Sequence, residues 1–392
     1  MPMNLWLDAT AEARRDAGLR RSVSPRTSGE TLLDLAGNDY LGLSHDPKVI
    51  DAAIDAARAW GTGSTGSRLV TGSTELHHEL EESLSDFVGH ERGLVFSSGY
   101  LANLGAVAAL TGSDALIVSD QLVHASLVDA CRLSRARVVV TPHRDSDAVD
   151  RTLAQRSEER AMVLTDAVFS VDGDLAPVAE LVDLTSRHSA VLLVDEAHSL
   201  GTVGAGGRGV LAAAGLAGRD HVVSTVTLSK SLGAQGGAVI GSARVIDHLI
   251  DAARPFIFDT GLAPTSVGAA SAALQILRRR PQLAAAVRAR ARDLHAIATE
   301  LGFDSSEPAA AVVSIRVGDP LLAVEAARVC ANHGVRVGCF RPPSTPDASA
   351  RLRLTARADL SSDDLDLAAT ALAAASETIL AGSVSSNPRP KT

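Results

Sequence analysis

The sequence has few cysteines, no excess of positive charge and no long apolar run. Its three cysteines, Cys131, Cys330 and Cys339, are an odd number without a CxxC spacing. This argues against a disulfide framework or a zinc site and fits a reducing compartment. The net charge is −9 at pH 7. The chain therefore lacks the overall electrostatic footprint of a protein that binds nucleic acid or an anionic membrane.

Membrane and secretion signals are also missing. No stretch approaches the roughly 18 apolar residues of a membrane-spanning helix. The N-terminus, MPMNLWLDATAEARRD, reaches Asp8 and Glu12 before any apolar run develops, which is unlike a signal peptide. We therefore expect a cytoplasmic protein that binds no nucleic acid, no membrane and no metal.

What the sequence does have is enough apolar residues for a large core. The 392 residues are 46% hydrophobic, and a domain holds roughly 100–200 residues, which predicts two or three domains. Residues 47–60 place apolar side chains at helical spacing between Pro47 and Gly61, which predicts an amphipathic helix. Beyond it, seven short apolar runs are typical of strands buried on both faces; they lie at 93–98, 115–120, 137–142, 161–170, 190–198, 221–230 and 236–242.

The segments between these runs are long enough for helices and lack hairpin dipeptides such as Asn-Gly. Such alternation predicts an α/β fold on a mostly parallel, seven-stranded sheet. From about residue 265 the pattern changes to a long helical stretch (268–301) and then to mixed short strands and helices. We therefore predict an N-terminal segment (1–45), a large domain (46–265) and a smaller α+β C-terminal domain (266–392).

Several predicted strands end in polar residues, among them Asp120, Ser170, Asp195 and Thr227. Ligands of open α/β sheets bind at the carboxyl ends of the strands. The sequence therefore predicts one site along this edge of the sheet.

Nucleotide-binding motifs are incomplete. Two GxGxxG patterns, at 61–66 and 204–209, lack the preceding strand and following helix that dinucleotide binding requires. We interpret them as glycine turns at close backbone approaches. Residues 195–198 spell DEAH, but the chain has no Walker A pattern. A nucleotide-dependent nucleic-acid protein is therefore only a remote alternative.

Lys230, in TLSKSLG, has two interpretations. A lone lysine is by default a solvated surface residue. Together with Asp195 it can instead form a Schiff base opposite a carboxylate that pairs with a pyridinium nitrogen. Two features favour the second interpretation. The turn at 97–100 precedes a helical stretch and so offers backbone N–H groups to a phosphate, and His124 follows another strand, where it can stack on a planar ring.

Five segments occur in the order SSGYLAN, DQLVHASL, TDAVFSVDGDLAP, VDEAHSLG and TLSKSLG, and together they resemble the α-oxoamine synthase family of pyridoxal-phosphate enzymes. The resemblance extends to LAGNDYLGLSHDP (35–47), GTGSTGSRLVTGST (61–74) and FRPPSTPDASARLRLT (340–355), so it covers nearly the whole chain. It implies a fold-type I transferase whose cofactor is pyridoxal 5'-phosphate. One departure is Ser199, because the family usually has glycine after the histidine.

The resemblance also implies the roles of the cofactor site. Lys230 would hold the cofactor as a Schiff base and then act as the base, Asp195 would keep the pyridine nitrogen protonated, and His124 would stack on the ring. The other expected cofactor contacts are Gly99, Tyr100, Ser170, His198, Thr227 and, from a neighbouring subunit, Thr260. This last contact implies a homodimer with interfacial active sites.

On the substrate side the resemblance implies that Arg353 clamps an amino-acid carboxylate, a task suited to a planar fork of donors. Segment 340–355 favours the family member that condenses L-alanine with pimeloyl-CoA or a pimeloyl-carrier protein. Glycine C-acetyltransferase stays open as an alternative because it shares the cofactor site. The further expected substrate contacts are Arg20, Asn38, Arg341, Ser344 and Thr345.

Overall fold

The structure is a computed structural model that describes residues 1–345 and 347–385, with side chains through residue 380. The chain forms two compact units. The smaller unit comprises Met1–Gly37, Val171–Gly173 and Ala289–Thr392, and the larger unit comprises Asn38–Ser170 and Asp174–Arg288. These units group segments by proximity, whereas the domains expected from the sequence are consecutive stretches, so those boundaries stay a prediction.

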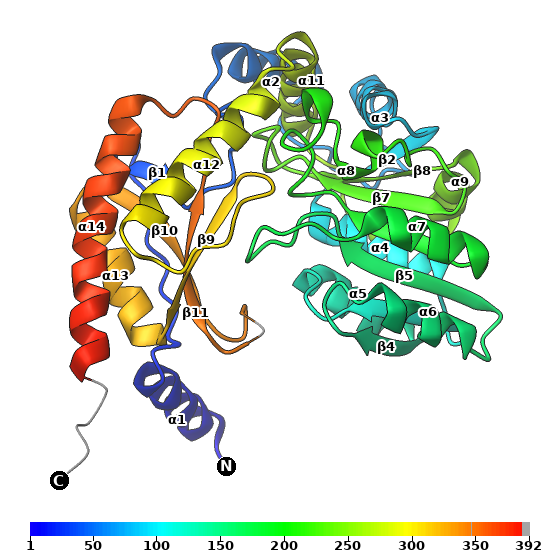
Figure 1. Cartoon of the computed structure of the whole chain (residues 1–392). Coiled ribbons are helices and arrows are strands. Elements are labelled where there is room, and N and C mark those ends of the chain that lie inside the picture. The colour runs from blue at the N-terminus through cyan, green and yellow to red at the C-terminus, as the bar shows by residue number, and fades with distance from the viewer. Residues whose placement is uncertain (346, 386–392) are drawn as a thin grey trace. The chain divides into compact units, whose positions relative to one another are not determined.

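A seven-stranded sheet forms the centre of the larger unit, in the order β2-β8-β7-β6-β5-β3-β4 (Figure 1). Strand β8 is antiparallel to both of its neighbours, and the other pairs are parallel. The predicted mostly parallel α/β sheet is thereby confirmed. The strands are β2 (Arg92–Phe96), β3 (Ala115–Asp120), β4 (Arg137–Thr141), β5 (Arg160–Asp166), β6 (Val191–Asp195), β7 (Val222–Thr227) and β8 (Gly237–Gly241).

Helices connect these strands, and Figure 1 shows α6 and α7 in front of the sheet and α4 behind it. Local sequence sets their ends. Helix α2 (Pro47–Trp60) starts after Asp46, whose carboxylate accepts from Lys48 N at 2.9 Å, and stops at Gly61. The other helices of this unit are α3 (Glu75–Val88), α4 (Gly99–Leu110), α5 (Ala125–Ser134), α6 (Ser146–Ala154), α7 (Val178–Arg187), α8 (Val210–Ala213), α9 (Ala243–Ala252), α10 (Arg254–Ile257) and α11 (Pro264–Arg279).

The core between α4 and the sheet fixes the strand ends that carry the site. Ile117, Leu164 and Leu193, on three adjacent strands, are completely or almost completely buried against small residues of α4 such as Ala102 and Ala106. Burying each such large aliphatic side chain contributes roughly 1.5–3 kcal/mol. Because this layer is close-packed, the polar residues one step beyond it have little freedom to move.

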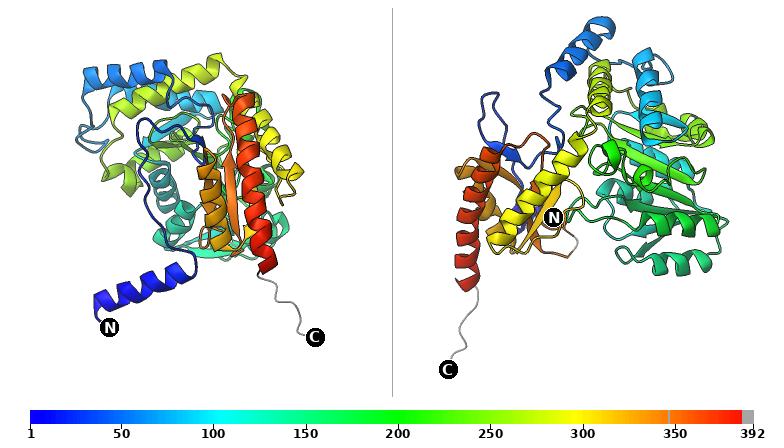
Figure 2. Two further views of the ribbon diagram at one scale, coloured as in Figure 1. Left: turned by 90° about the vertical axis from the view of Figure 1, so that its left-hand side faces the viewer. Right: turned by 45° about the horizontal axis from the view of Figure 1, so that its top comes forward.

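The smaller unit is an α+β structure around a four-stranded sheet, in the order β1-β10-β11-β9. Strand β1 (Leu33–Leu35) pairs parallel with β10 (Val335–Phe340), whereas β11 (Ala350–Thr355) is antiparallel to β10 and to β9 (Val312–Gly318). Figure 2 shows α14 (Ser362–Ser385) along this sheet beside α13 (Pro320–Asn332), while α1 (Met3–Asp16) projects from the unit.

The expected continuous helical stretch at 268–301 is instead two helices, α11 and α12 (Leu283–Glu300). Pro281 lies in the break, where it lacks the N–H that a continuous helix would need. Within the described part of the chain, no helix combines the length and apolar character needed to cross a membrane.

Candidate active site

Asp195, at the end of β6, is held in one orientation by two N–H donors. Its Oδ2 accepts from Asn103 Nδ2 at 2.7 Å, and its Oδ1 accepts from Ala197 N at 2.9 Å. Asn103 lies on α4 and is itself fixed, because its Oδ1 accepts from Thr225 Oγ1 at 2.6 Å. Asp195 and Asn103 are both buried. The site therefore presents a buried, oriented carboxylate as a partner for a protonated ring nitrogen.

A second carboxylate, Asp166, ends the adjacent strand β5 in register with Asp195. Its pKa is raised well above the usual range, first by burial and then by the neighbouring charge of Asp195. Its Oδ1 accepts from His124 N at 3.2 Å. Burial and the adjacent Asp195 carboxylate therefore disfavour the ionised form of Asp166.

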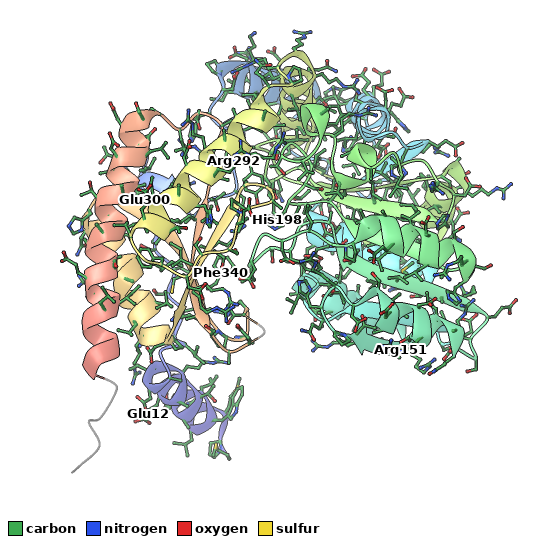
Figure 3. All side chains as sticks on the ribbon, in the orientation of Figure 1. Glu12, Arg151, His198, Arg292, Glu300 and Phe340 are labelled. Carbon is green, nitrogen blue, oxygen red and sulfur yellow. The ribbon has the colours of Figure 1, made fainter. Side chains whose placement is uncertain are left out.

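Lys230 begins a chain of hydrogen bonds that crosses the site. Its Nζ lies 2.8 Å from His198 Nε2, and His198 Nδ1 lies 2.6 Å from the Tyr40 hydroxyl, which donates to Asn38 Oδ1 at 3.1 Å. Assigned from this network, the neutral tautomer of His198 has its proton on Nδ1. Its Nε2 then accepts from Lys230. His198, labelled in Figure 3, lies on the segment that follows β6.

His124 caps α5 with its ring. Ser126 N donates to His124 Nδ1 at 3.3 Å and Ser126 Oγ lies 2.7 Å from it, which leaves the proton of a neutral ring on Nε2. The residue is exposed. Desolvation by the surrounding protein lowers the pKa of His124, against the attraction of Asp195, and Lys230 lowers it further. A neutral imidazole with an open face is suited to stacking.

The start of α4 forms a cradle for an anion. Ala102 N makes the first intrahelical bond, to Ser98 O, so the N–H groups of Gly99 and Tyr100 precede the helical ladder. A Cβ on Gly237 would lie 2.4 Å from Gly99 Cα, so only glycine fits there. Thr227 also lies next to the helix N-terminus, since a Cβ on Gly99 would lie 3.1 Å from the Cβ of Thr227. A helix N-terminus lined by a hydroxyl is a phosphate site.

These features fit pyridoxal 5'-phosphate. The anion cradle suits its phosphate, the open imidazole its ring, the buried carboxylate its pyridine nitrogen and Lys230 its aldehyde. The observation that decides the fit is the close approach of Gly237 to Gly99, because any side chain at position 237 would collide with the backbone at the helix N-terminus.

The remaining predicted cofactor contacts have definite positions in the larger unit. Ser170 is half-buried and follows β5, and Thr260 is exposed in an isolated bridge with Ser67. Tyr100 turns its side chain to the surface, where the hydroxyl donates to Asp129 at 2.5 Å. Only its backbone N–H therefore faces the anion cradle.

The smaller unit gathers the predicted acyl-substrate residues around one loop. Arg341 donates to the carbonyls of Gly18 and Arg20, and Arg21, not Arg20, donates from its side chain to Ser344 Oγ at 3.3 Å. A cavity of about 190 Å³ opens there. Thr345 is buried beside this group.

Arg353 lies on β11 of the same unit. It is 3% exposed, and its guanidinium lies 5.2 Å from the ring centre of Phe340. Phe340, labelled in Figure 3, ends β10, the strand next to β11. Asn38, its predicted helper, belongs to the larger unit and contacts Tyr40. A shared role of Asn38 and Arg353 therefore stays a prediction.

The sequence did not predict the residues that hydrogen-bond to the predicted site residues or to their partners. These are Asn103, Thr225, Tyr40 and Asp166. One signal was present for Asn103, because an amide inside the apolar stretch LANLGAVAAL needs a buried partner. The departure at Ser199 has a structural role, since its hydroxyl donates to the Glu196 carboxylate, which also accepts from the first N–H groups of α8.

Comparisons with known proteins agree with this site. The site defines a pyridoxal-phosphate-dependent enzyme, and the aminotransferase class I and II family matches residues 30–372. The chain belongs to this family. It is 60% identical over 368 residues to the 8-amino-7-oxononanoate synthase of Mycobacterium sp. (strain JLS), covering 94% of this chain and 95% of that one. The relative of the same name from Mycolicibacterium gilvum is 60% identical over 363 residues, covering 93% and 94%.

Solved structures show the same fold. Serine palmitoyltransferase from S. paucimobilis, with a bound PLP–myriocin aldimine, has a TM-score of 0.89 at 30% identity, covering 96% of this chain and 98% of that one. The 8-amino-7-oxononanoate synthase of Francisella tularensis has a TM-score of 0.77 at 24% identity, covering 90% and 99%. The resemblance to the α-oxoamine synthases, the fold type and the cofactor are thereby confirmed.

Proposed function

We propose that this enzyme condenses L-alanine with a pimeloyl thioester, in biotin biosynthesis, to give 8-amino-7-oxononanoate, carbon dioxide and a free thiol. The observation that carries the reaction type is the pairing of Lys230 with His198 beside the oriented Asp195. The choice of substrates is supported by the relatives of that name at 60% identity. The chain is thus a pyridoxal-phosphate-dependent acyltransferase.

The cofactor, when bound, supplies an aldehyde that captures amines and a ring that accepts an electron pair from the α-carbon. Lys230 holds it and then, as a free amine, takes the α-proton of L-alanine at Nζ. His198 Nε2 accepts a hydrogen bond from Nζ and so keeps the amine within reach. Asp195 stabilises the proton on the ring nitrogen, and His124 covers one ring face.

The other predicted contacts complete the binding of cofactor and substrates. Gly99 and Tyr100 donate backbone N–H groups, and Thr227 its hydroxyl, to the phosphate, and Ser170 bonds near the phenolic oxygen. Arg353 binds the alanine carboxylate with help from Asn38. The acyl chain is contacted by Arg20, Arg341, Ser344 and Thr345, and Arg21 joins this set because its side chain reaches Ser344.

A homodimer is part of the proposal, with Thr260 of each subunit reaching the phosphate of the other. Support comes from exposed apolar side chains near Thr260 in the larger unit: Phe258 is 68% exposed, Leu69 52% and Val70 78%. Exposed apolar clusters of this kind mark interaction surfaces. Light scattering during gel filtration tests this, and a mass of 40.5 kDa, that of one chain, would rule the dimer out.

We also propose a cytoplasmic location. All three cysteines are free thiols, with Cys131 and Cys330 buried and Cys339 half-buried. Free thiols are usual in a reducing compartment. Fractionation of the source cells tests this proposal, and enzyme recovered outside the cytoplasm would contradict it.

The function is tested by adding L-alanine, glycine or L-serine to the purified holoenzyme and then a pimeloyl donor, CoA-linked or carrier-linked. We expect the visible cofactor band to respond to L-alanine and the product to have the mass of 8-amino-7-oxononanoate. A response to glycine alone, with no product from either pimeloyl donor, would favour glycine C-acetyltransferase. The Lys230→Ala variant serves as the inactive control, and wild-type turnover by that variant would refute the mechanism.

A further inference from the structure

His143 forms an ion-pair cluster beside the cofactor site. It follows β4, and its Nδ1 lies 3.0 Å from Asp120 Oδ1 while its Nε2 lies 2.8 Å from Asp174 Oδ2. Both partners are carboxylates, which only accept hydrogen bonds, whereas a neutral imidazole has a single N–H. The two contacts are therefore satisfied together only by the imidazolium form. The Phe169 ring packs edge-on against His143, with ring centres 4.4 Å apart.

Each of the two carboxylates shapes a different part of the site. Asp120 ends β3, and its Oδ1 accepts from Leu122 N at 2.8 Å, which forms the turn leading to His124. Asp174 belongs to the return arm of a hairpin whose outgoing arm carries Ser170. The arms are joined by Phe169 N donating to Asp174 O and Ala176 N donating to Ala167 O.

We propose that His143 is a positioning residue of the cofactor site, a cationic clamp that ties the turn presenting His124 to the hairpin arms presenting Ser170. The proposal rests on the roles proposed above for His124 and Ser170. In this proposal His143, Asp120 and Asp174 do not touch the reacting atoms. They act on the chemistry only by positioning the turn before His124 and the hairpin that carries Ser170.

The surrounding charges support a cation at His143. The carboxylates of Asp120 and Asp174 raise its pKa to about 9, against the opposing effect of burial. Arg144 also faces the cluster, with its backbone N donating to Asp120 and its guanidinium 3.4 Å from Asp174. Asp166, on the adjacent strand β5, is also near enough for the Asp120 charge to raise its pKa, after the larger effects of burial and Asp195. Above about pH 9 the imidazole keeps one N–H and can hold only one carboxylate.

Replacing His143 by glutamine tests the clamp, because its amide can donate at one end only. The matched control is His188→Gln, which removes another imidazole–carboxylate contact of the larger unit, 2.7 Å to Asp150, at the end of α7. At one fixed pH we expect the Phe169, Ala176 and Leu122 amides of the His143→Gln holoenzyme to exchange hydrogen about tenfold faster than in the wild type, the effect of one lost charge-assisted hydrogen bond. The control should exchange at wild-type rates.

A second measurement separates positioning from general stability. The visible circular dichroism of the bound cofactor should change in the wild type and in His188→Gln with a midpoint near pH 9, and this transition should be missing from His143→Gln. If His143→Gln does not fold, Asp174→Asn replaces it and should move the midpoint to lower pH. A wild-type exchange pattern in His143→Gln, or a transition that neither substitution alters, would overturn the proposal. Product formation from L-alanine by the wild type tests the enzyme function separately.

Discussion

Tyr40→Phe is the sharpest test of the hydrogen-bond chain that ends at Lys230. The ring of Tyr40 is fully buried, so phenylalanine keeps the packing and removes only the hydroxyl. That hydroxyl fixes the His198 tautomer by occupying Nδ1 at 2.6 Å. Without it, the imidazole can carry its proton on Nε2, where it no longer accepts from Lys230.

The cost of depriving a buried polar group of its partner is about 1–3 kcal/mol. At 1.36 kcal/mol per factor of ten, the expected loss in kcat/KM for L-alanine is roughly 5- to 150-fold. Exchange of the alanine α-proton with heavy water, measured without an acyl donor, should fall by the same factor because it isolates proton removal. Thr185→Val removes a buried hydroxyl from α7 of the same unit and should change neither rate by more than about twofold. Wild-type rates in Tyr40→Phe would refute this reasoning.

Three further outcomes follow from buried groups of the larger unit. Asn103→Ala removes a donor to Asp195, and kcat/KM should fall roughly 10- to 150-fold in steady-state kinetics, since hydrogen bonds to charged groups contribute about 1.5–3 kcal/mol. Glu81→Gln leaves the buried Arg68 guanidinium without its carboxylate 2.9 Å away, and the unfolding free energy from urea titration should drop by about 3–5 kcal/mol. Burial lowers the pKa values of His77 and His90 to about 4. The neutral form of each histidine therefore stabilises the fold fully above pH 6.5, and this stabilisation is lost as the pH falls. At pH 5 the unfolding free energy from urea titration should be about 2 kcal/mol lower per histidine than at pH 8. Equal urea midpoints at pH 5 and pH 8 would contradict this prediction.

The sequence predicted the sheet of the larger unit well because its strands are buried on both faces. An apolar run such as 190–198 predicts both the strand and the polar residues that follow its end. The same reasoning could not find β1, since Leu33–Leu35 is three residues long and its partner β10 lies about 300 residues further along the chain. Pairing over such a separation leaves no local periodicity to detect.

The candidate site divides in the same way. Lys230, Asp195 and His124 carry side chains whose chemistry is recognisable from type and order. Tyr40 contacts His198, and Asn103 contacts Asp195, from distant parts of the chain. No local sequence pattern links position 40 to position 198. Sequence therefore predicts the reactive groups, whereas three-dimensional proximity is needed to find the groups that orient them.

The two carboxylates at the ends of β5 and β6 show why this orientation matters. In neighbouring strands and in register, Asp166 and Asp195 repel each other when both are ionised. Asp195 accepts from Asn103 and Ala197, whereas Asp166 accepts one backbone N–H, from His124. The hydrogen-bond donors therefore favour a carboxylate at position 195, while burial and the neighbouring carboxylate raise the pKa of Asp166.

An isosteric exchange at each position tests this division of charge. Asp166→Asn keeps an oxygen for His124 N and replaces a carboxyl whose ionised form is disfavoured by burial, so kcat/KM should stay within about tenfold of the wild type. Asp195→Asn removes the carboxylate that stabilises the ring-nitrogen proton, and the loss should exceed about 100-fold, the effect of a missing buried charge partner of about 3 kcal/mol. Equal losses in the two variants would mean that the charge is shared between the two side chains, and the role of Asn103 in directing it to Asp195 would have to be abandoned.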